Sequence, residues 1–246
     1  FPYTTLFRSS ERKRIEQMKS EFVSTVSHEL RTPLTAIAGA LGLINGGALG
    51  AVPGAMQDML RIAQNNSLRL GDLINDLLDM EKLIAGKMTF DIRPHALQAL
   101  LEAAIEQNQP YAEQFHVHLQ LVTAASDLQV SVDSQRLGQV LANLLSNAAK
   151  FSPQGSHVDV AVVSLDGRAR ISVRDLGAGI PQVFRSRIFS KFSQADSTDT
   201  RQKGGTGLGL AISKQLIENM GGQIGFESSE NQGSTFWIEL PLLARS

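Results

Sequence analysis

The strongest constraint on the fold is a pair of long apolar repeats at helical spacing, separated by a stretch that favours a loop. In the first repeat, apolar residues recur every three or four positions, at Phe22, Val23, Val26, Leu30, Leu34, Ile37 and Leu41, as on one helix face. The same spacing returns between Met56 and Ile84, after "INGGALGAVPG". Two such helices form an antiparallel hairpin. Because one hairpin cannot cover both apolar stripes, we expect residues 11–86 to dimerise into a four-helix bundle.

Beyond Gly86 the pattern changes to short alternating runs mixed with helical ones. The runs "HVDVAVVSL" and "RARISVRDL" flank the turn pair Asp166-Gly167 and predict a β-hairpin. Further strands are expected at "MTFDI", "VHLQLV", "LQVSV", "QIGFESS" and "STFWIEL", and helices at 96–114, 134–149 and 208–220. Because no strict βαβ order emerges, residues 87–246 are expected to form one sheet with helices on one face. The whole chain is thus predicted to be an α+β multidomain protein.

The composition limits the partners that the chain can have. It has 23 basic and 24 acidic residues, a formal net charge of −1. We therefore expect no nucleic acid and no anionic membrane surface among its partners. It has no cysteine, which excludes disulfides and cysteine metal sites.

Two segments bear on the terminus and on membranes. The first residues, FPYTTLFRS, resemble the translation of a sequencing adapter, so residues 1–10 are interpreted as an artefact or a disordered terminus. Between Thr32 and Gln57 no residue is charged, but Asn, Gly and Pro within this stretch favour a helix end and a loop over a membrane span. We expect this part of the protein to be cytoplasmic, with any anchor in the inner or plasma membrane lying in a missing N-terminal region.

One histidine is placed to face solvent. In "STVSHELRTPL", His28 falls roughly opposite the apolar stripe, and Thr32 lies one turn further on the same face. An imidazole that is free of packing can act as a nucleophile, and the neighbouring Glu29 can fix its tautomer. Pro33 removes a backbone donor and can kink the helix.

A polar stripe follows the helix predicted from Ser134. Asn143, Asn147 and Lys150 recur at i, i+4 and i+7, either as a solvent-exposed face or as the lining of a cleft. In a cleft, an Asn carbonyl can bind a hard cation such as Mg²⁺, and Lys150 can contact a phosphate.

Two glycine-rich turns follow further along the chain. "DLGAGI" carries Asp175 at the end of a predicted strand, and "KGGTGLGL" comes directly before a predicted helix. Each is typical of a simple turn or linker. Alternatively, Asp175 accepts a hydrogen bond from an adenine amino group, and the second turn presents backbone N–H groups to phosphate.

Together these motifs resemble those of the sensor histidine kinases of two-component systems, over nearly the whole chain after residue 10. "FVSTVSHELRTPLTAI" resembles the phosphoacceptor box of that family, "NLLSNAAKFSP" its Asn box, and "DLGAGI" and "GGTGLGL" its glycine boxes, with "IFSKFSQAD" between them. The resemblance implies a dimeric helical hairpin followed by an α/β sandwich ATP-binding domain of the Bergerat type. It implies ATP and Mg²⁺ as cofactors, autophosphorylation of a histidine, and transfer to an aspartate of a response-regulator receiver domain.

The resemblance also implies a role for each residue of the site. His28 is the phosphoacceptor, Glu29 the base that orients it, and Thr32 the residue of a phosphatase reaction. Asn147 is the Mg²⁺ ligand, and Asp175 binds the adenine amino group. The other nucleotide-binding positions are Asn143, Lys150, Phe151, Gly177, Gly179, Lys203, Gly205, Thr206, Gly207, Leu208 and Gly209.

Two departures and three alternatives stand beside this interpretation. Leu176 and Phe151 replace the Asn and Tyr that are frequent in the family. The alternatives are an ATPase of the same fold that drives conformational change, a catalytically silent dimerisation scaffold, and an ATP-binding protein that acts chiefly as a phosphatase. His28 argues against the first, and Asn147 and Asp175 argue against the second.

Overall fold

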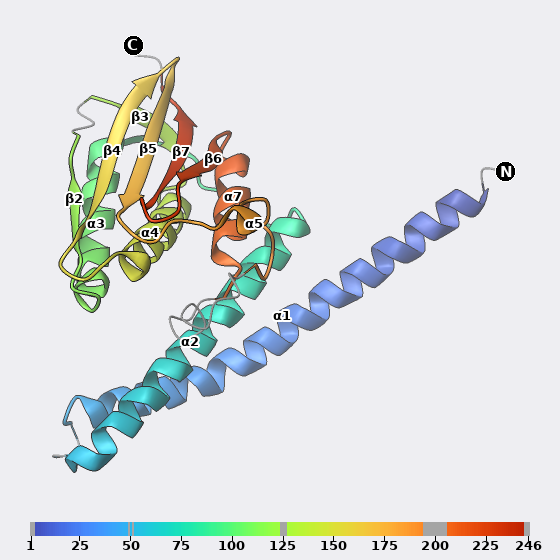
Figure 1. Cartoon of the computed structure of the whole chain (residues 1–246). Coiled ribbons are helices and arrows are strands. Elements are labelled where there is room, and N and C mark those ends of the chain that lie inside the picture. The colour runs from blue at the N-terminus through green and yellow to red at the C-terminus, as the bar shows by residue number, and fades with distance from the viewer. Residues whose placement is uncertain (1–2, 49, 51, 124–126, 194–205, 244–246) are drawn as a thin grey trace. The chain divides into compact units, whose positions relative to one another are not determined.

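The structure is a computed structural model that describes residues 3–48, 50, 52–123, 127–193 and 206–243 (Figure 1). The chain divides into two compact units, Phe1–Met88 and Thr89–Ser246. The division lies close to residue 86, where the sequence pattern changes. Each unit has its own architecture and is described by itself.

The first unit is a hairpin of two helices, α1 (Tyr3–Asn45) and α2 (Gly54–Ile84). Gly47 and Gly50 in the connection have φ angles of +76° and +103°, which favour glycine. α1 begins at Tyr3 and therefore includes most of the first ten residues, and it continues through Pro33. Within the described ranges, no helix has the length and apolar character that a membrane span requires.

Polar contacts fix the register of α1 against α2. Arg31 Nη2 donates to Asn75 Oδ1 at 2.9 Å, and Asn45 Nδ2 donates to Gln64 Oε1 at 2.6 Å. Between them, Ser67 Oγ donates to the carbonyl of Leu34 at 3.3 Å. Sliding one helix along the other would break these hydrogen bonds. They therefore oppose a change of register that apolar packing alone would permit.

The apolar stripe of α1 is only half covered within one hairpin. Leu34 and Leu41 are half-buried, whereas Val26, Leu30 and Ile37 are 37–50% exposed. The large apolar residues of α2 that are also exposed are Met56, Met59, Ile62, Leu68, Leu70 and Ile84. This partial exposure agrees with the expectation that one hairpin cannot cover the apolar stripes of both helices.

The second unit contains a five-stranded sheet with helices on one face, which confirms the predicted class (Figure 1). The strand order is β2-β4-β5-β7-β6, in which β2 and β4 are parallel and the other neighbours antiparallel. The strands are β2 (His118–Leu121), β4 (His157–Leu165), β5 (Arg168–Asp175), β6 (Gln223–Ser228) and β7 (Ser234–Pro241). The helices are α3 (Leu97–Glu113), α4 (Ser134–Phe151), the short α5 (Gln182–Arg185) and α7 (Gly209–Asn219).

Every second side chain along the strands packs the sheet against the helices. On β5, Ala169, Ile171 and Val173 are almost completely buried, while Arg174 is exposed. The apolar face of α4 supplies the opposite side of the core, with Leu137, Val140, Leu141, Leu144 and Leu145 at most 2% exposed. The packing brings α4 into contact with β5 and with α7, so polar residues at the borders of these elements lie near one another.

One strand is displaced from its predicted position. "MTFDI" was expected to be a strand, but residues 87–92 have no regular structure, and β1 is Arg93–Ala96. Among the residues that the structure describes, β1 pairs only with β3 (Gln129–Val132), and together they form a separate two-stranded sheet. Pro94 is compatible with this edge position because it has no N–H to donate to a second neighbour.

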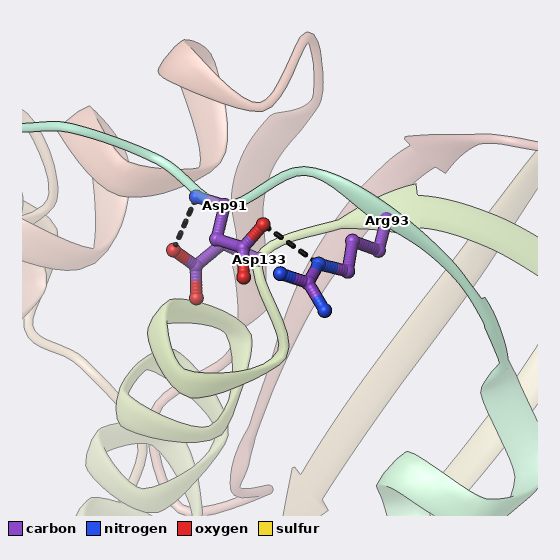
Figure 2. A network of polar contacts seen from close by, with 3 residues as sticks. All are labelled: Asp91, Arg93 and Asp133. Atoms are coloured by element: carbon purple, nitrogen blue, oxygen red, sulfur yellow. Dashed lines mark hydrogen bonds and ion pairs between the residues drawn. The ribbon is translucent and has the colours of Figure 1, made fainter.

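Asp133 caps α4 and ties it to the segment that leads into β1 (Figure 2). Its Oδ1 accepts from the N–H of Arg136, and its Oδ2 accepts from the N–H of Asp91, both at 3.0 Å. Asp91 also pairs with Arg93 Nε at 2.8 Å. Burial raises the pKa of Asp133, but the N–H groups of Asp91, Arg136 and Gln135 and the charge of Arg136 outweigh it and hold the pKa below its ordinary value.

Replacing Asp133 with alanine is expected to lower the free energy of unfolding by about 1–2 kcal/mol, whereas Asp133→Asn keeps a cap acceptor and costs less. Because the folded-state pKa is lowered, the carboxylate stabilises the fold fully above its ordinary pKa of 3.8. This stabilisation is lost as the pH falls through the lower folded value. Urea unfolding, monitored by the fluorescence of Trp237, the single tryptophan, measures the cost of each substitution at pH 7 and its dependence on pH. An unchanged midpoint for Asp133→Ala at pH 7 would contradict the assignment of Asp133 as a stabilising cap.

Candidate active site

The candidate nucleophile lies on the surface of α1. His28, Glu29 and Thr32 are all exposed, which confirms the orientation predicted for the imidazole. Thr32 Oγ1 donates to the carbonyl of His28 at 3.4 Å, one turn back along the helix. The imidazole is therefore accessible to a reactant that arrives from solvent.

The polar stripe of α4 is not a fully solvent-exposed face, since Asn143 and Asn147 are half-buried and Lys150 is buried. Asn147 Nδ2 donates to Asn143 Oδ1 at 3.2 Å, and Asn143 Nδ2 donates to Ser213 Oγ on α7 at 2.9 Å. Lys150 is only 9% exposed, and its Nζ lies 4.9 Å from the ring centre of Phe151. The stripe thus presents amide groups at the border between α4 and α7, and Lys150 adds a cation in the last turn of α4.

Asp175 is a buried carboxylate at the end of β5. It is 5% exposed, and its Oδ1 accepts hydrogen bonds from the N–H groups of Gly177 at 2.8 Å and Ser234 at 3.2 Å. Burial raises the pKa of Asp175, and these two N–H groups oppose that rise only in part. Buried groups with shifted pKa values cluster at functional sites, which makes Asp175 a candidate for ligand recognition.

Two glycines let the chain pass close to the ends of α4 and β6. A Cβ on Gly177 would lie 2.5 Å from the carbonyl oxygen of Phe151, so the segment after Asp175 can touch the end of α4 only with glycine. Gly179 has a φ of +73°, and a Cβ there would overlap the carbonyl of Ser229. Gly177 therefore lets the segment after Asp175 lie beside the last turn of α4, and Gly179 lets it pass the residue that follows β6.

The second glycine-rich segment leads directly into α7. Gly207 has a φ of +69°, and the N–H of Leu208 donates to Thr206 Oγ1 at 3.1 Å before the helix begins at Gly209. The first N–H groups of a helix are available to an anion. Lys203 and Gly205, which the sequence also assigned to this site, lie outside the described residues.

Some residues of the site were not identified from the sequence. Ser213 and Ser234 bind Asn143 and Asp175, respectively. The only signal for Ser213 was a hydroxyl residue within the apolar run "GLAISKQLI". Two hollows of about 420 and 410 Å³ lie elsewhere in this unit, along α3 and β2, and no residue of the site lines them.

Models of known families match both units. The model described as the His Kinase A (phospho-acceptor) domain matches residues 18–86, which include α2 and the part of α1 that carries His28. The model described as the histidine kinase-, DNA gyrase B- and HSP90-like ATPase matches residues 132–244, which include Asn147 and Asp175.

Similar curated proteins are sensor kinases. The circadian input-output histidine kinase CikA of Synechococcus elongatus is 40% identical over 231 residues, covering 91% of this chain and 30% of that protein. The sensor protein GacS of Pseudomonas syringae pv. syringae is 41% identical over 231 residues, covering 92% of this chain and 25% of that protein. The chain therefore spans less than a third of the length of these two relatives.

Solved structures agree with this relationship. Full-length ShkA in complex with AMPPNP has a TM-score of 0.74 and 31% identity, covering 92% of this chain and 46% of that one. The catalytic domain of histidine kinase ThkA has a TM-score of 0.53 and 30% identity, covering 63% of this chain and 96% of that one. The chain therefore belongs to the histidine kinases, and its two units form a histidine kinase catalytic core.

Proposed function

We propose that this chain phosphorylates its own His28 with ATP and passes the phosphoryl group to an aspartate of a response-regulator receiver domain. One combination of features carries the proposal: an exposed imidazole on α1, a buried carboxylate at the end of β5, and paired amides on α4 that lie against α7. The first is suited to receive a phosphoryl group, and the second to bind the nucleotide that supplies it.

Asp175 is assigned to the adenine of ATP. The hydrogen bonds from Gly177 and Ser234 to its Oδ1 fix the plane of the carboxylate. In this orientation Oδ2 accepts a hydrogen bond from the exocyclic amino group of adenine. Guanine carries an acceptor oxygen at the corresponding position, so the same carboxylate disfavours GTP.

Asn147 is assigned to Mg²⁺, and its chemistry fits that ion. Its Nδ2 is engaged by Asn143, which leaves its Oδ1 as the end of the amide that binds a cation. Mg²⁺ commonly takes one or two protein oxygens and completes its shell with phosphate and water, and it neutralises charge on phosphate oxygens. Residues assigned to the phosphates are Lys150, Lys203, Gly205, Thr206, Gly207, Leu208 and Gly209.

The proposed reaction moves one phosphoryl group in two steps. In the first, a ring nitrogen of neutral His28 attacks the γ-phosphorus, an N–P bond forms, and ADP leaves with the electron pair of the broken P–O bond. Glu29 accepts a hydrogen bond from the other ring nitrogen and stabilises its positive charge. In the second, an aspartate oxygen of the receiver attacks the phosphorus, and the N–P electron pair returns to the imidazole.

The same surface suits a dephosphorylation reaction. Thr32 is exposed one turn beyond His28, so its hydroxyl is placed to orient a water molecule towards a phosphorylated receiver docked on α1. The exposed apolar residues of α1 and α2 support a homodimer in which two hairpins form a four-helix bundle. We place this core in the cytoplasm, where ATP and receiver domains are available.

A labelling experiment tests the proposal. The chain is incubated with Mg²⁺ and ATP labelled on the γ-phosphate, and a purified receiver domain is then added. The expected result is a label on the chain that is stable in base, lost in acid, and transferred to the receiver. Release of labelled phosphate from a chain that never carries the label would support the ATPase alternative instead.

A further inference from the structure

We propose that Ser213 is a positioning residue that orients the side chain of Asn147 for Mg²⁺, acting through Asn143. The inference rests on the proposed assignment of Asn147. Ser213 lies on α7, and no part of the proposed chemistry so far uses it. It is 2% exposed and surrounded in sequence by the buried Ala211, Ile212 and Leu216.

Two hydrogen bonds form a relay from α7 to the proposed metal ligand. Ser213 Oγ accepts from Asn143 Nδ2 at 2.9 Å, and Asn143 Oδ1 accepts from Asn147 Nδ2 at 3.2 Å. Both amides therefore donate their hydrogen bonds in the direction of Ser213. At its end, Asn147 turns its nitrogen towards Asn143, and its oxygen is the atom left for a cation.

The observed orientation of the first amide uses the hydroxyl of Ser213 as an acceptor. If both amides turned by 180°, Asn143 Nδ2 would instead donate to Asn147 Oδ1 and occupy the oxygen assigned to the cation. An acceptor at position 213 stabilises the observed orientation because it satisfies the Nδ2 of Asn143 in a largely buried site. Without that acceptor, the turned arrangement is favoured because it alone gives the Nδ2 of Asn143 a partner, and the oxygen of Asn147 is then no longer left for the cation.

Close packing of the two helices supports the same conclusion. A Cβ on Gly209 would overlap Oδ1 of Asn143, so the first residue of α7 lies directly against the relay. Ser213 lies one turn further along the same helix and contacts the same amide. The segment that leads from the glycine-rich turn into α7 is thus coupled to Asn147 through one side chain.

The test compares nucleotide binding with and without the metal. Calorimetric titration of the whole chain with the ATP analogue AMPPNP is carried out in excess Mg²⁺ and in EDTA. Ser213→Ala is expected to reduce the gain in affinity that Mg²⁺ provides by about tenfold, the scale on which residues that orient metal ligands act. Affinity in EDTA is expected to be unchanged.

Three further variants separate orientation from packing. Ser213→Cys keeps roughly the size of the side chain but offers only a weak acceptor. It should therefore show the same reduced Mg²⁺ effect as Ser213→Ala, and it tests the inference even if the alanine variant folds poorly. Ser213→Thr keeps the hydroxyl and should retain the Mg²⁺ effect. Ser172→Ala removes a hydroxyl that contacts the Ala161 carbonyl on β4 and serves as the matched control.

The outcomes are distinct. An undiminished Mg²⁺ effect in both Ser213→Ala and Ser213→Cys overturns the inference. An equal loss of affinity in Mg²⁺ and in EDTA also overturns it, since that result assigns Ser213 to packing. A wild-type chain that binds AMPPNP equally with and without Mg²⁺ contradicts the assignment of Asn147 and the inference together, whereas the first two outcomes leave the proposed function intact.

Discussion

Replacing His28 with glutamine abolishes the incorporation of phosphate from ATP, with an expected loss of at least about 1000-fold, the scale seen when a catalytic nucleophile is removed. Glutamine is polar and fits an exposed helix position, but its amide nitrogen is not nucleophilic. Because His28 is exposed on α1, the fold should not change. Autoradiography after brief incubation with γ-labelled ATP measures the effect.

The control for this variant is His118→Gln. His118 is also exposed, but it lies on the edge strand β2 in the second unit. The His118→Gln variant should incorporate phosphate at the wild-type rate. Both His28→Gln and His118→Gln should bind nucleotide as the wild type does. Retained acid-labile, base-stable labelling of His28→Gln would show that another residue accepts the phosphoryl group.

Replacing Asp175 with asparagine weakens ATP binding by about 100-fold, as expected for the loss of a hydrogen bond to a charged group together with an unpaired buried donor. The Oδ1 position must accept from Gly177 and Ser234, so the new NH₂ group takes the Oδ2 position. There it faces the adenine amino group, and two donors oppose each other. Equilibrium titration with a fluorescent ATP analogue measures the loss.

A matched control and the pH dependence sharpen this test. Asp159→Asn alters a half-buried carboxylate on β4 that accepts a hydrogen bond from Gln120 on β2, and this variant should leave ATP binding unchanged.

Burial raises the pKa of Asp175, and protonation turns its acceptor into a donor. Wild-type affinity should therefore fall as the pH decreases through this raised pKa, and Asp175→Asn should lack that dependence. Equal affinity of the two chains at pH 7 would contradict the adenine assignment.

Elements with long, regular patterns were predictable from the sequence. The helical spacing of α2 persists for about 30 residues, and α4 begins at Ser134, where the predicted helix begins. The pair Asp166-Gly167 supplies the two positive φ angles of a tight hairpin turn. The prediction misplaced β1 because this strand is defined by its pairing with β3. β3 lies more than 30 residues further along the chain, and local alternation does not reveal such a partner.

Within the site, the sequence identified residue types better than their connections. The spacing of Asn143 and Asn147 placed them on one face, and they are hydrogen-bonded. The contribution of Ser213 depends on how α7 packs against α4, and no local pattern encodes that contact. Likewise, Ser234 reaches Asp175 only because β5 and β7 are neighbours in the sheet.

Mapping of the phosphorylated residue tests the central claim most directly. The wild-type chain is incubated with ATP and Mg²⁺, digested at alkaline pH, and analysed by tandem mass spectrometry with fragmentation that preserves N–P bonds. The account predicts phosphate on His28 within the peptide SEFVSTVSHELR. Phosphate on a serine or threonine of that peptide, or on any other histidine of the chain, would contradict it.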